Sequence, residues 1–248
     1  MEWFLAMLPA FILVALLSAA EMLVRPARAD WWRNLQAWLL NTLGAMAAIP
    51  LLITLGGPAL VQGADLPVWA GVLGYLVVRD GLEFLFHRAQ HTVPWLWSMH
   101  SLHHSDPDMS ALTSGRHFWA EPIIKAMTIW PLTALIIAPT PLILGLFNLF
   151  SLWNFVVHAR LPFGFGRFSW LLNSPAYHRR HHSILPEHYN SNYAALLPIF
   201  DVAFGSYNRP EGWPPTGLDT RPGSLRDLVA WPVRQGQENR QQQALPQA

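Results

Sequence analysis

The chain has 248 residues, of which 52% are hydrophobic and only 12% are charged. Soluble domains carry about 25% charged residues, so this composition is typical of a membrane protein. The formal net charge is only +1, and cysteine is absent, which excludes disulfides, thiolate–metal sites and cysteine nucleophiles.

Apolar runs predict membrane helices in chain order. The first, about 3–24, is as long as the roughly 20 residues that span a bilayer. It lacks the basic start of a signal peptide, so we expect a retained helix. A second run covers about 37–55, and a third begins near 67 and continues into the first histidine cluster. The shorter runs 122–138 and 141–158 predict a helical hairpin.

Basic residues predict the orientation of these helices. Arg25, Arg28 and Arg33 lie between the first two runs, whereas segments 56–67 and 138–141 contain no lysine or arginine. Positive residues favour the cytoplasmic side, so the helices alternate with every histidine cluster facing the cytoplasm. We therefore predict an all-α, polytopic membrane bundle with a cytoplasmic helical cap carrying a histidine-rich di-metal site. It would lie in a bacterial inner membrane or a eukaryotic ER-type membrane.

The chain after about residue 159 is more polar and is interrupted by glycine and proline. Ser224 is expected to cap a short helix through Val229. Leu225, Leu228 and Trp231 would then rest on a membrane surface. The Gln-rich tail 235–248 is predicted to be disordered, which leaves one domain over 1–234.

Eight of the eleven histidines lie in three short clusters, one with the spacing H-x-x-x-H and two with H-x-x-H-H. Neutral imidazole is the commonest transition-metal ligand, and eight imidazoles are too many for one tetrahedral site. The clusters therefore predict a pair of metal ions. The alternative, solvated surface histidines, does not account for the repeated spacing. The clustered residues are His87, His91, His100, His103, His104, His178, His181 and His182.

The third helix should carry a polar stripe. At 100° per residue, Asp80, Glu83, His87 and His91 fall within an arc of about 80°. Ionisable groups at membrane depth usually mark function, although such a stripe can also pack on other helices. His87 and His91 would bind one metal or bracket two. Asp80 and Glu83 would accept an imidazole N–H and fix its tautomer.

Each H-x-x-H-H cluster is expected to present its three imidazoles on one helical face. Imidazole suits iron, zinc, copper and nickel, and zinc has no redox chemistry. The residues alone leave iron and zinc open.

These motifs resemble the fatty acid hydroxylase / sterol desaturase superfamily of membrane di-iron oxygenases. The resemblance covers about 79–207 and rests on the stretches 80–91, 96–105, 113–117, 174–183, 192–193 and 201–207, together with His158. It implies that the eight clustered histidines and His158 bind two iron ions, which zinc can replace in a purified form. Departures at Arg160, Pro162, Ala194 and Phe200 leave the subfamily open.

Four further polar residues lie outside the three clusters and His158. His117 is expected either beside the metals or substrate, or as a structural histidine. Asn192 and Asp201 would hydrogen-bond ligand imidazoles or form a structural turn. His188 is expected to face solvent.

The resemblance also implies the reaction. A lipid C–H bond would be hydroxylated or desaturated with O2 and external electrons. A cytochrome b5-, ferredoxin- or reductase-like donor would supply them, because the chain shows no flavin or iron–sulfur motif. No nucleic-acid partner is expected, and the substrate and oligomeric state stay open. A metal transporter, whose site would lie near the bilayer midplane, and a non-catalytic metal-stabilised scaffold are the alternatives.

Overall fold

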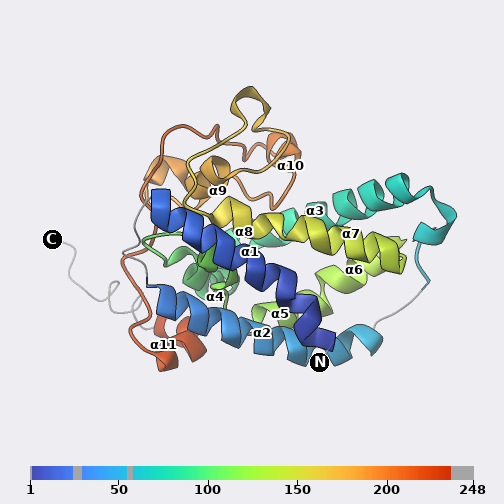
Figure 1. Ribbon diagram of the computed structural model, residues 1–248, viewed down its shortest axis with the longest axis horizontal. Helices are drawn as coiled ribbons and strands as arrows, with labels where there is room; N and C mark the ends of the chain where they lie inside the picture. Colours follow the sequence, from blue (N-terminus) through green and yellow to red (C-terminus); the bar gives the residue numbers. More distant parts are fainter. Residues whose placement is uncertain (1, 25–29, 55–57, 236–248) are drawn as a thin grey trace.

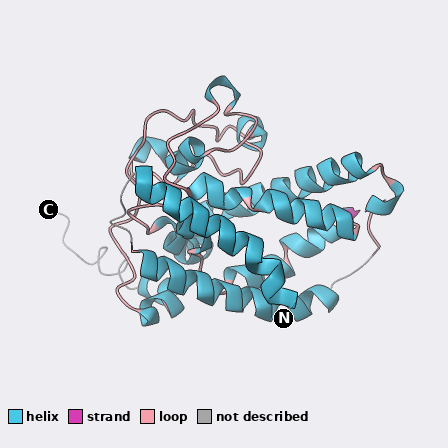
Figure 2. Cartoon of the chain, viewed as in Figure 1, coloured by secondary structure: helices cyan, strands magenta, loops and turns pink. Residues whose placement is uncertain are grey.

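The computed structural model describes residues 2–24, 30–54 and 58–235, and over these residues the protein is predominantly helical (Figures 1 and 2). Arg25, Arg28 and the predicted disordered tail, apart from Gln235, lie outside the described residues. In chain order the elements are α1 (Glu2–Val24), α2 (Trp31–Thr54), β1 (Val61–Gln62), η1 (Gly63–Asp65), α3 (Val68–Thr92), α4 (Pro94–His104), η2 (Ala111–Gly115), α5 (Glu121–Met127), α6 (Ile129–Ile136), β2 (Ile137–Ala138), α7 (Pro141–Ser151), α8 (Trp153–His158), η3 (Gly166–Phe168), α9 (Pro175–His181), η4 (Pro186–His188), α10 (Ile199–Ala203) and α11 (Leu225–Val229), where η denotes a 3-10 helix.

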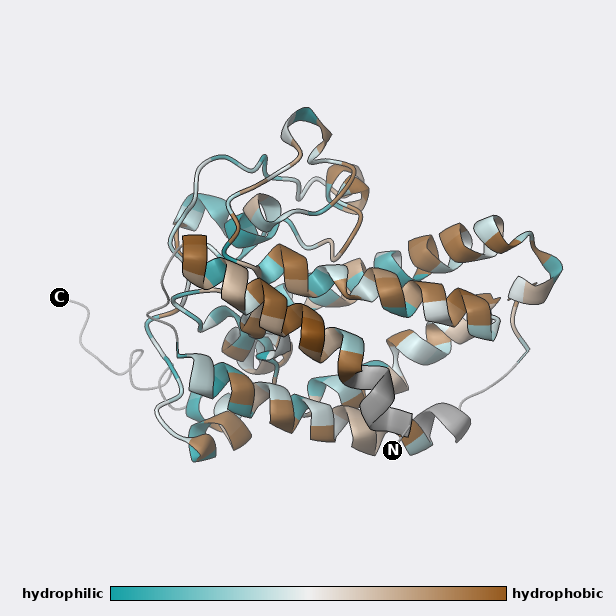
Figure 3. Cartoon of the chain, in the orientation of Figure 1, coloured by the Kyte–Doolittle hydropathy of each residue, from teal (hydrophilic) through white to brown (hydrophobic). Residues whose placement is uncertain are grey.

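Helices α1, α2 and α3 correspond to the first three apolar runs. Helix α2 begins at Trp31, about six residues earlier than predicted, because residues 31–36 join the same helix. Helix α3 is continuous from Val68 to Thr92, so the predicted polar stripe lies on one helix. Figure 3 shows apolar residues concentrated along α1 and α7, and polar residues around α9 and its neighbouring loops.

The predicted hairpin is present, but each of its arms is interrupted. The first arm divides at Thr128 into α5 and α6. Pro131 provides the reason, since proline lacks the N–H that would bond the carbonyl of Met127. The second arm is interrupted only at Leu152, whose backbone stays in the helical region, so α7 and α8 together form one stretch. The two loops far from the histidines are joined by a parallel pairing of β1 with β2, with Val61 opposite Ile137.

One helical stretch among the described residues, Pro141–His158, is long and apolar enough to cross a bilayer, and Leu8–Val24 is a shorter apolar stretch. Only 17% of the Pro141–His158 stretch is buried within the protein. One side of this stretch, with Ile143 and Val157, is buried, and several of its other apolar side chains, such as Leu142 and Leu149, are exposed. The multi-pass arrangement expected from the sequence stays a prediction.

The C-terminal helix closes the core beside α4. Ser224 caps α11 through its side chain, which accepts from the Asp227 N–H, and this confirms the predicted cap. The expected contact of Leu228 and Trp231 with a membrane surface is wrong. Both side chains are buried against Ala37 of α2 and the apolar face of α4. The Trp231 indole N–H also donates to the Ser101 hydroxyl over 2.9 Å, which gives its polar atom an internal partner.

A buried carboxylate joins α1 to the rest of the protein. Glu21 is 1% exposed, and its Oε1 accepts from the backbone N–H groups of Ala111 and Arg160, each over 2.8 Å. Its Oε2 lies 3.9 Å from the Arg160 guanidinium. Three segments distant in sequence thus meet at one side chain, next to the histidine-bearing elements.

Replacing Glu21 by leucine should destabilise the protein by several kcal/mol, because each buried donor left without an acceptor costs about 1–3 kcal/mol. Thermal unfolding of the purified protein in detergent measures the effect. Glu21→Gln is the control, since it keeps an acceptor oxygen and should lose less. Equal unfolding temperatures for Glu21→Leu and the wild type would contradict this role.

Candidate metal centre

Helices α3, α4 and α9, together with the end of α8, bring nine histidines into two adjacent groups. Within each group the nitrogens able to bind a metal all lie within 4.8 Å of one another. The first group is His87, His91, His100, His104 and His181, and the second is His103, His158, His178 and His182. All nine histidines expected at a di-metal site therefore lie in these two groups.

Helical spacing explains why residues four apart in one cluster share a group. Residues four apart, such as His100 and His104, lie only about 40° apart around a helix and enter the same group. The residue between them, His103, points about 100° away from His104 and enters the other group. The three imidazoles of each H-x-x-H-H cluster span an arc of about 100°, and from that side of the helix they serve both groups. His87 and His91, left open by the sequence, lie in one group.

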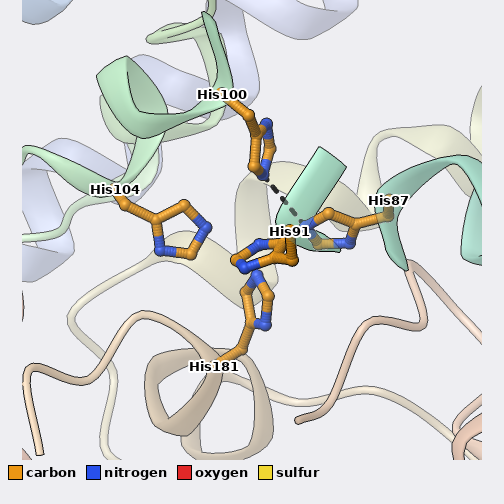
Figure 4. A group of neighbouring side chains, drawn as sticks. All are labelled: His87, His91, His100, His104 and His181. Carbon is orange, nitrogen blue, oxygen red and sulfur yellow. Dashed lines mark hydrogen bonds between the residues drawn. The ribbon is translucent and has the colours of Figure 1, made fainter. Parts of the chain in front are cut away.

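The imidazole rings approach one another through their Nε2 atoms. In the first group, His87 Nε2 lies 3.0 Å from His100 Nε2. Figure 4 shows the five rings arranged around a common centre. In the second group, His158 Nε2 lies 3.1 Å from His103 Nε2 and 2.9 Å from His178 Nε2. The two groups touch where the rings of His104 and His182 stack, with centroids 4.2 Å apart.

Backbone carbonyls orient three of these rings from behind. His87 Nδ1–H donates to the Tyr193 carbonyl over 2.6 Å, and His181 Nδ1–H donates to the Ser191 carbonyl over 2.8 Å. In the second group, His158 Nδ1–H donates to the Asn154 carbonyl over 2.6 Å. A carbonyl can only accept, so each contact places the proton on Nδ1 and leaves the Nε2 lone pair directed at the group.

The inward nitrogens of several rings are buried without a hydrogen-bond partner in the described part of the chain. They include Nε2 of His91, His104, His181 and His182. A buried polar atom without a partner is costly. Converging neutral imidazoles that lack partners fit a transition-metal cation, which accepts their lone pairs. The residues present therefore suit metal ions in both groups.

Burial also keeps His104 and His181 uncharged. It lowers the pKa of His181 from 6.5 to about 3, against the opposing effect of the Ser191 carbonyl. Burial and then the neighbouring His182 and His91 imidazoles hold the pKa of His104 well below its ordinary value. These rings are therefore neutral near pH 7, which is the form that binds a metal.

A cavity of about 510 Å³ extends from the histidines into the bundle. Its walls come from α2, α3 and the two arms of the hairpin. At the histidine end it is lined by both groups, and further away by Leu76, Trp130, Phe147 and Phe150. Its size suits a small-molecule or lipid-chain ligand.

A model described as fatty acid hydroxylase matches residues 72–206, which is more than half of the chain. The chain belongs to the fatty acid hydroxylase family. The resemblance of the motifs is thereby confirmed. No solved structure matches the chain significantly.

The names of several relatives of this chain state an activity on lipids. The chain is 36% identical over 140 residues to an alkylglycerol monooxygenase from Xenopus tropicalis, a match covering 56% of the chain and 30% of that protein. Identity to the human alkylglycerol monooxygenase is 33% over 144 residues, covering 56% of the chain and 31% of that protein. An ornithine lipid hydroxylase from Rhizobium tropici is 30% identical over 140 residues, covering 56% of the chain and 42% of that protein. The chain thus spans less than half the length of these relatives.

The carboxylates predicted to contact imidazoles in this fatty acid hydroxylase family member have other partners. Asp80 accepts from the backbone N–H groups of Leu196 and Leu197 over 2.9 and 2.8 Å. Glu83 pairs with two cations in the cavity wall. Both therefore depart from the expected role: Asp80 holds the loop after α9, because unpaired backbone donors face it there.

Glu121, rather than Asp80 or Glu83, is the carboxylate that approaches imidazole rings. Its Oε2 accepts from His117 Nδ1–H over 3.1 Å and from Gln90 over 2.7 Å, and lies 3.5 Å from His100 Nδ1. His117 stacks on His103 with ring centroids 4.1 Å apart, so it lies beside the second group. The sequence contained a signal for Glu121, namely its position one helical turn after His117.

Asn192 and Asp201 do not bond imidazoles; they shape the loop whose carbonyls do. Asp201 accepts from the N–H groups of Tyr193 and Ala194 over 2.9 and 2.8 Å. Asn192 adopts a φ of +61°, which asparagine tolerates better than most residues, and its side chain donates to the Asn208 carbonyl over 2.8 Å. Of the two roles weighed for these residues, the structural turn is the one present.

His188 is buried, which corrects the expectation that it faces solvent. It is 6% exposed, and its Nδ1 lies 2.8 Å from the Ser183 hydroxyl. It belongs to neither histidine group. The turn Pro186–His188 folds back on the end of α9, a tertiary contact that its loop-like local sequence does not indicate.

The metal-free protein should lose stability as the pH falls below about 6.5. The unfolded chain then protonates its histidines, whereas folded His181 stays neutral until about pH 3. At pH 5 each such histidine lowers the free energy of unfolding by about 2 kcal/mol. Unfolding in detergent at pH 7.5 and 5.0 measures this loss. In His181→Gln the loss between the two pH values should be smaller by about that amount; an equal or larger loss would contradict the assignment.

Proposed function

We propose that this protein is a membrane-bound, O2-dependent, non-haem di-iron oxygenase that hydroxylates a C–H bond of a lipid. The observation that carries this proposal is the pair of histidine groups at one end of a largely apolar cavity. Family membership and the lipid-oxidising activities named for the relatives support it. Desaturation or ether cleavage by the same site is the second outcome to test.

Each histidine group would hold one metal ion. The nine proposed ligands supply nitrogen only, which suits iron and also admits zinc in a purified form. Five imidazoles in the first group and four in the second leave little room for further protein ligands. Iron bound here would supply O2 binding and activation, the chemistry that amino-acid side chains lack.

The protein's own residues would then do three things. The carbonyls of Ser191, Tyr193 and Asn154 hold the imidazole rings in one orientation. The apolar cavity wall binds the lipid chain and excludes water from the reacting end. Glu121 keeps a proton on His117 Nδ1 at the edge of the site.

We further propose that residues 1–234 form one integral-membrane domain with the histidines at the cytoplasmic face. In support, the C-terminal ends of α1, α3 and α8 and the start of α2 lie toward the histidine end of the bundle (Figure 1). The exposed Trp31 and Trp32 at the start of α2 suit a membrane–water interface. An external reductant would reach the site from this side. A transporter would instead place its site near the midplane.

Two metal ions per chain are expected, and one should be lost in each of His91→Ala and His178→Ala. Both variants should abolish lipid oxidation, because the reaction needs both ions. Metal analysis of the purified proteins and lipidomics of cells expressing them measure the two effects. His188→Gln is the control: it lies outside both groups and should retain both ions. Iron-loaded wild type that leaves the lipid profile unchanged would refute the oxygenase proposal.

Asp201→Asn should weaken metal binding at the first group about 10- to 100-fold and spare the second. The reason is that Asp201 supports the loop carrying the carbonyl acceptors of His87 and His181, both in the first group. Zinc titration against a competing chelator resolves the two sites. Asp219→Asn, at an exposed loop position, is the control. Equal weakening of both sites would contradict this division.

A further inference from the structure

A group of charged side chains, called the belt below, lies between the histidine end and the apolar end of the cavity. It consists of Arg79, Asp80, Glu83 and Lys125. Arg79 Nη2 lies 2.8 Å from Glu83 Oε1, and Lys125 Nζ lies 2.9 Å from Glu83 Oε2. All three side chains line the cavity, as does Asp80. One carboxylate thus bridges two cations inside a space otherwise suited to an apolar chain.

One donor in this belt is unused. Arg79 is 8% exposed, and its Nη1 has no hydrogen-bond acceptor among the residues that the structure describes. Asp80 does not take this role, because its two oxygens accept from the backbone N–H groups of Leu196 and Leu197. A buried guanidinium N–H without an acceptor is costly, and a ligand oxygen in the cavity would remove that cost.

Charge balance indicates what kind of oxygen fits. The cavity is lined by two basic side chains, Arg79 and Lys125, and by two acidic ones, Asp80 and Glu83. A hydroxyl, ether or ester oxygen accepts one hydrogen bond from Arg79 and adds no charge to this group, whereas an anion would be drawn to metal ions bound by the neutral imidazoles rather than to this donor. The free donor therefore suits an uncharged oxygen.

The position of the belt sets the distance from this oxygen to the metals. Glu83 is one helical turn before His87 on α3, and Arg79 is one further turn away. The belt therefore lies about 6 to 12 Å from the histidine level. Beyond it the wall is apolar, with Leu76 and Phe147.

We infer that Arg79 binds an uncharged oxygen of the lipid substrate. Oxidation would then occur on a carbon within about 12 Å of that oxygen, the distance from Arg79 to the histidine level. This rests on the proposed function, since it assigns the substrate class of the same site. Arg79 is here a specificity-determining residue, and the substrate is an amphiphile whose polar oxygen enters the cavity rather than remaining in the headgroup layer.

Binding of 12-carbon probes to zinc-loaded protein tests this, because zinc cannot oxidise them. Native mass spectrometry from detergent micelles measures the retention of dodecanol, dodecane and dodecanoate over a concentration series. Dodecanol should bind about tenfold or more tightly than dodecane. Arg79→Gln should remove most of this preference without changing dodecane binding, and Arg79→Lys should keep part of it.

Arg88→Gln is the matched control, because Arg88 is on the same helix but donates to the Phe204 carbonyl outside the cavity. Zinc content shows whether each variant retains its fold. Equal binding of dodecanol and dodecane by wild type overturns the inference even if Arg79→Gln fails to fold. Tighter binding of dodecanoate than dodecanol that is lost in Arg79→Gln also overturns it, because a carboxylate held by zinc alone would keep its affinity in that variant. Intact selectivity in a protein that neither binds iron nor consumes O2 overturns the proposed function alone.

Discussion

The structure depends on the burial of nine imidazoles whose lone pairs face one another. Burying a polar nitrogen without a partner is unfavourable, and several of these nitrogens have none among the described residues. The protein nevertheless brings them together from four helical segments. A bound cation would resolve the conflict, because it would accept the lone pairs that otherwise have no partner. Bringing the histidines together lowers the stability of the metal-free fold. Metal binding would recover that stability, so folding and metal binding would be coupled.

The arrangement is maintained by residues that do not themselves approach the metal positions. Asp201 and Asn192 organise the segment after α9, and its carbonyls fix the ring orientation of His87 and His181. Asp80 ties the same segment to α3. Loop and helix are thus joined by carboxylates that accept backbone N–H groups. Such bonds hold a loop in position more rigidly than side-chain packing alone.

The cavity combines two environments that a lipid oxidation needs. Its apolar wall can hold a hydrocarbon chain and keep water from the reacting end, while the belt around Arg79 and Glu83 offers a polar contact at a defined depth. A purely apolar tunnel would let a chain slide along its length. A single directional hydrogen bond from Arg79 would fix the register, and with it the carbon that faces the histidines.

The sequence by itself determined the histidine clusters, the long helices carrying them and the family, because ligand spacing and hydrophobic periodicity are local patterns. His87 and His91 needed only the helical repeat to be placed on one face. Tertiary structure alone decided how His103 and His104 divide between groups, that Glu121 rather than Asp80 approaches His100, and that Trp231 and His188 are buried. These outcomes depend on which segments pack against each helix face. A side chain finds its partner among residues distant in the chain, and no local pattern records that choice.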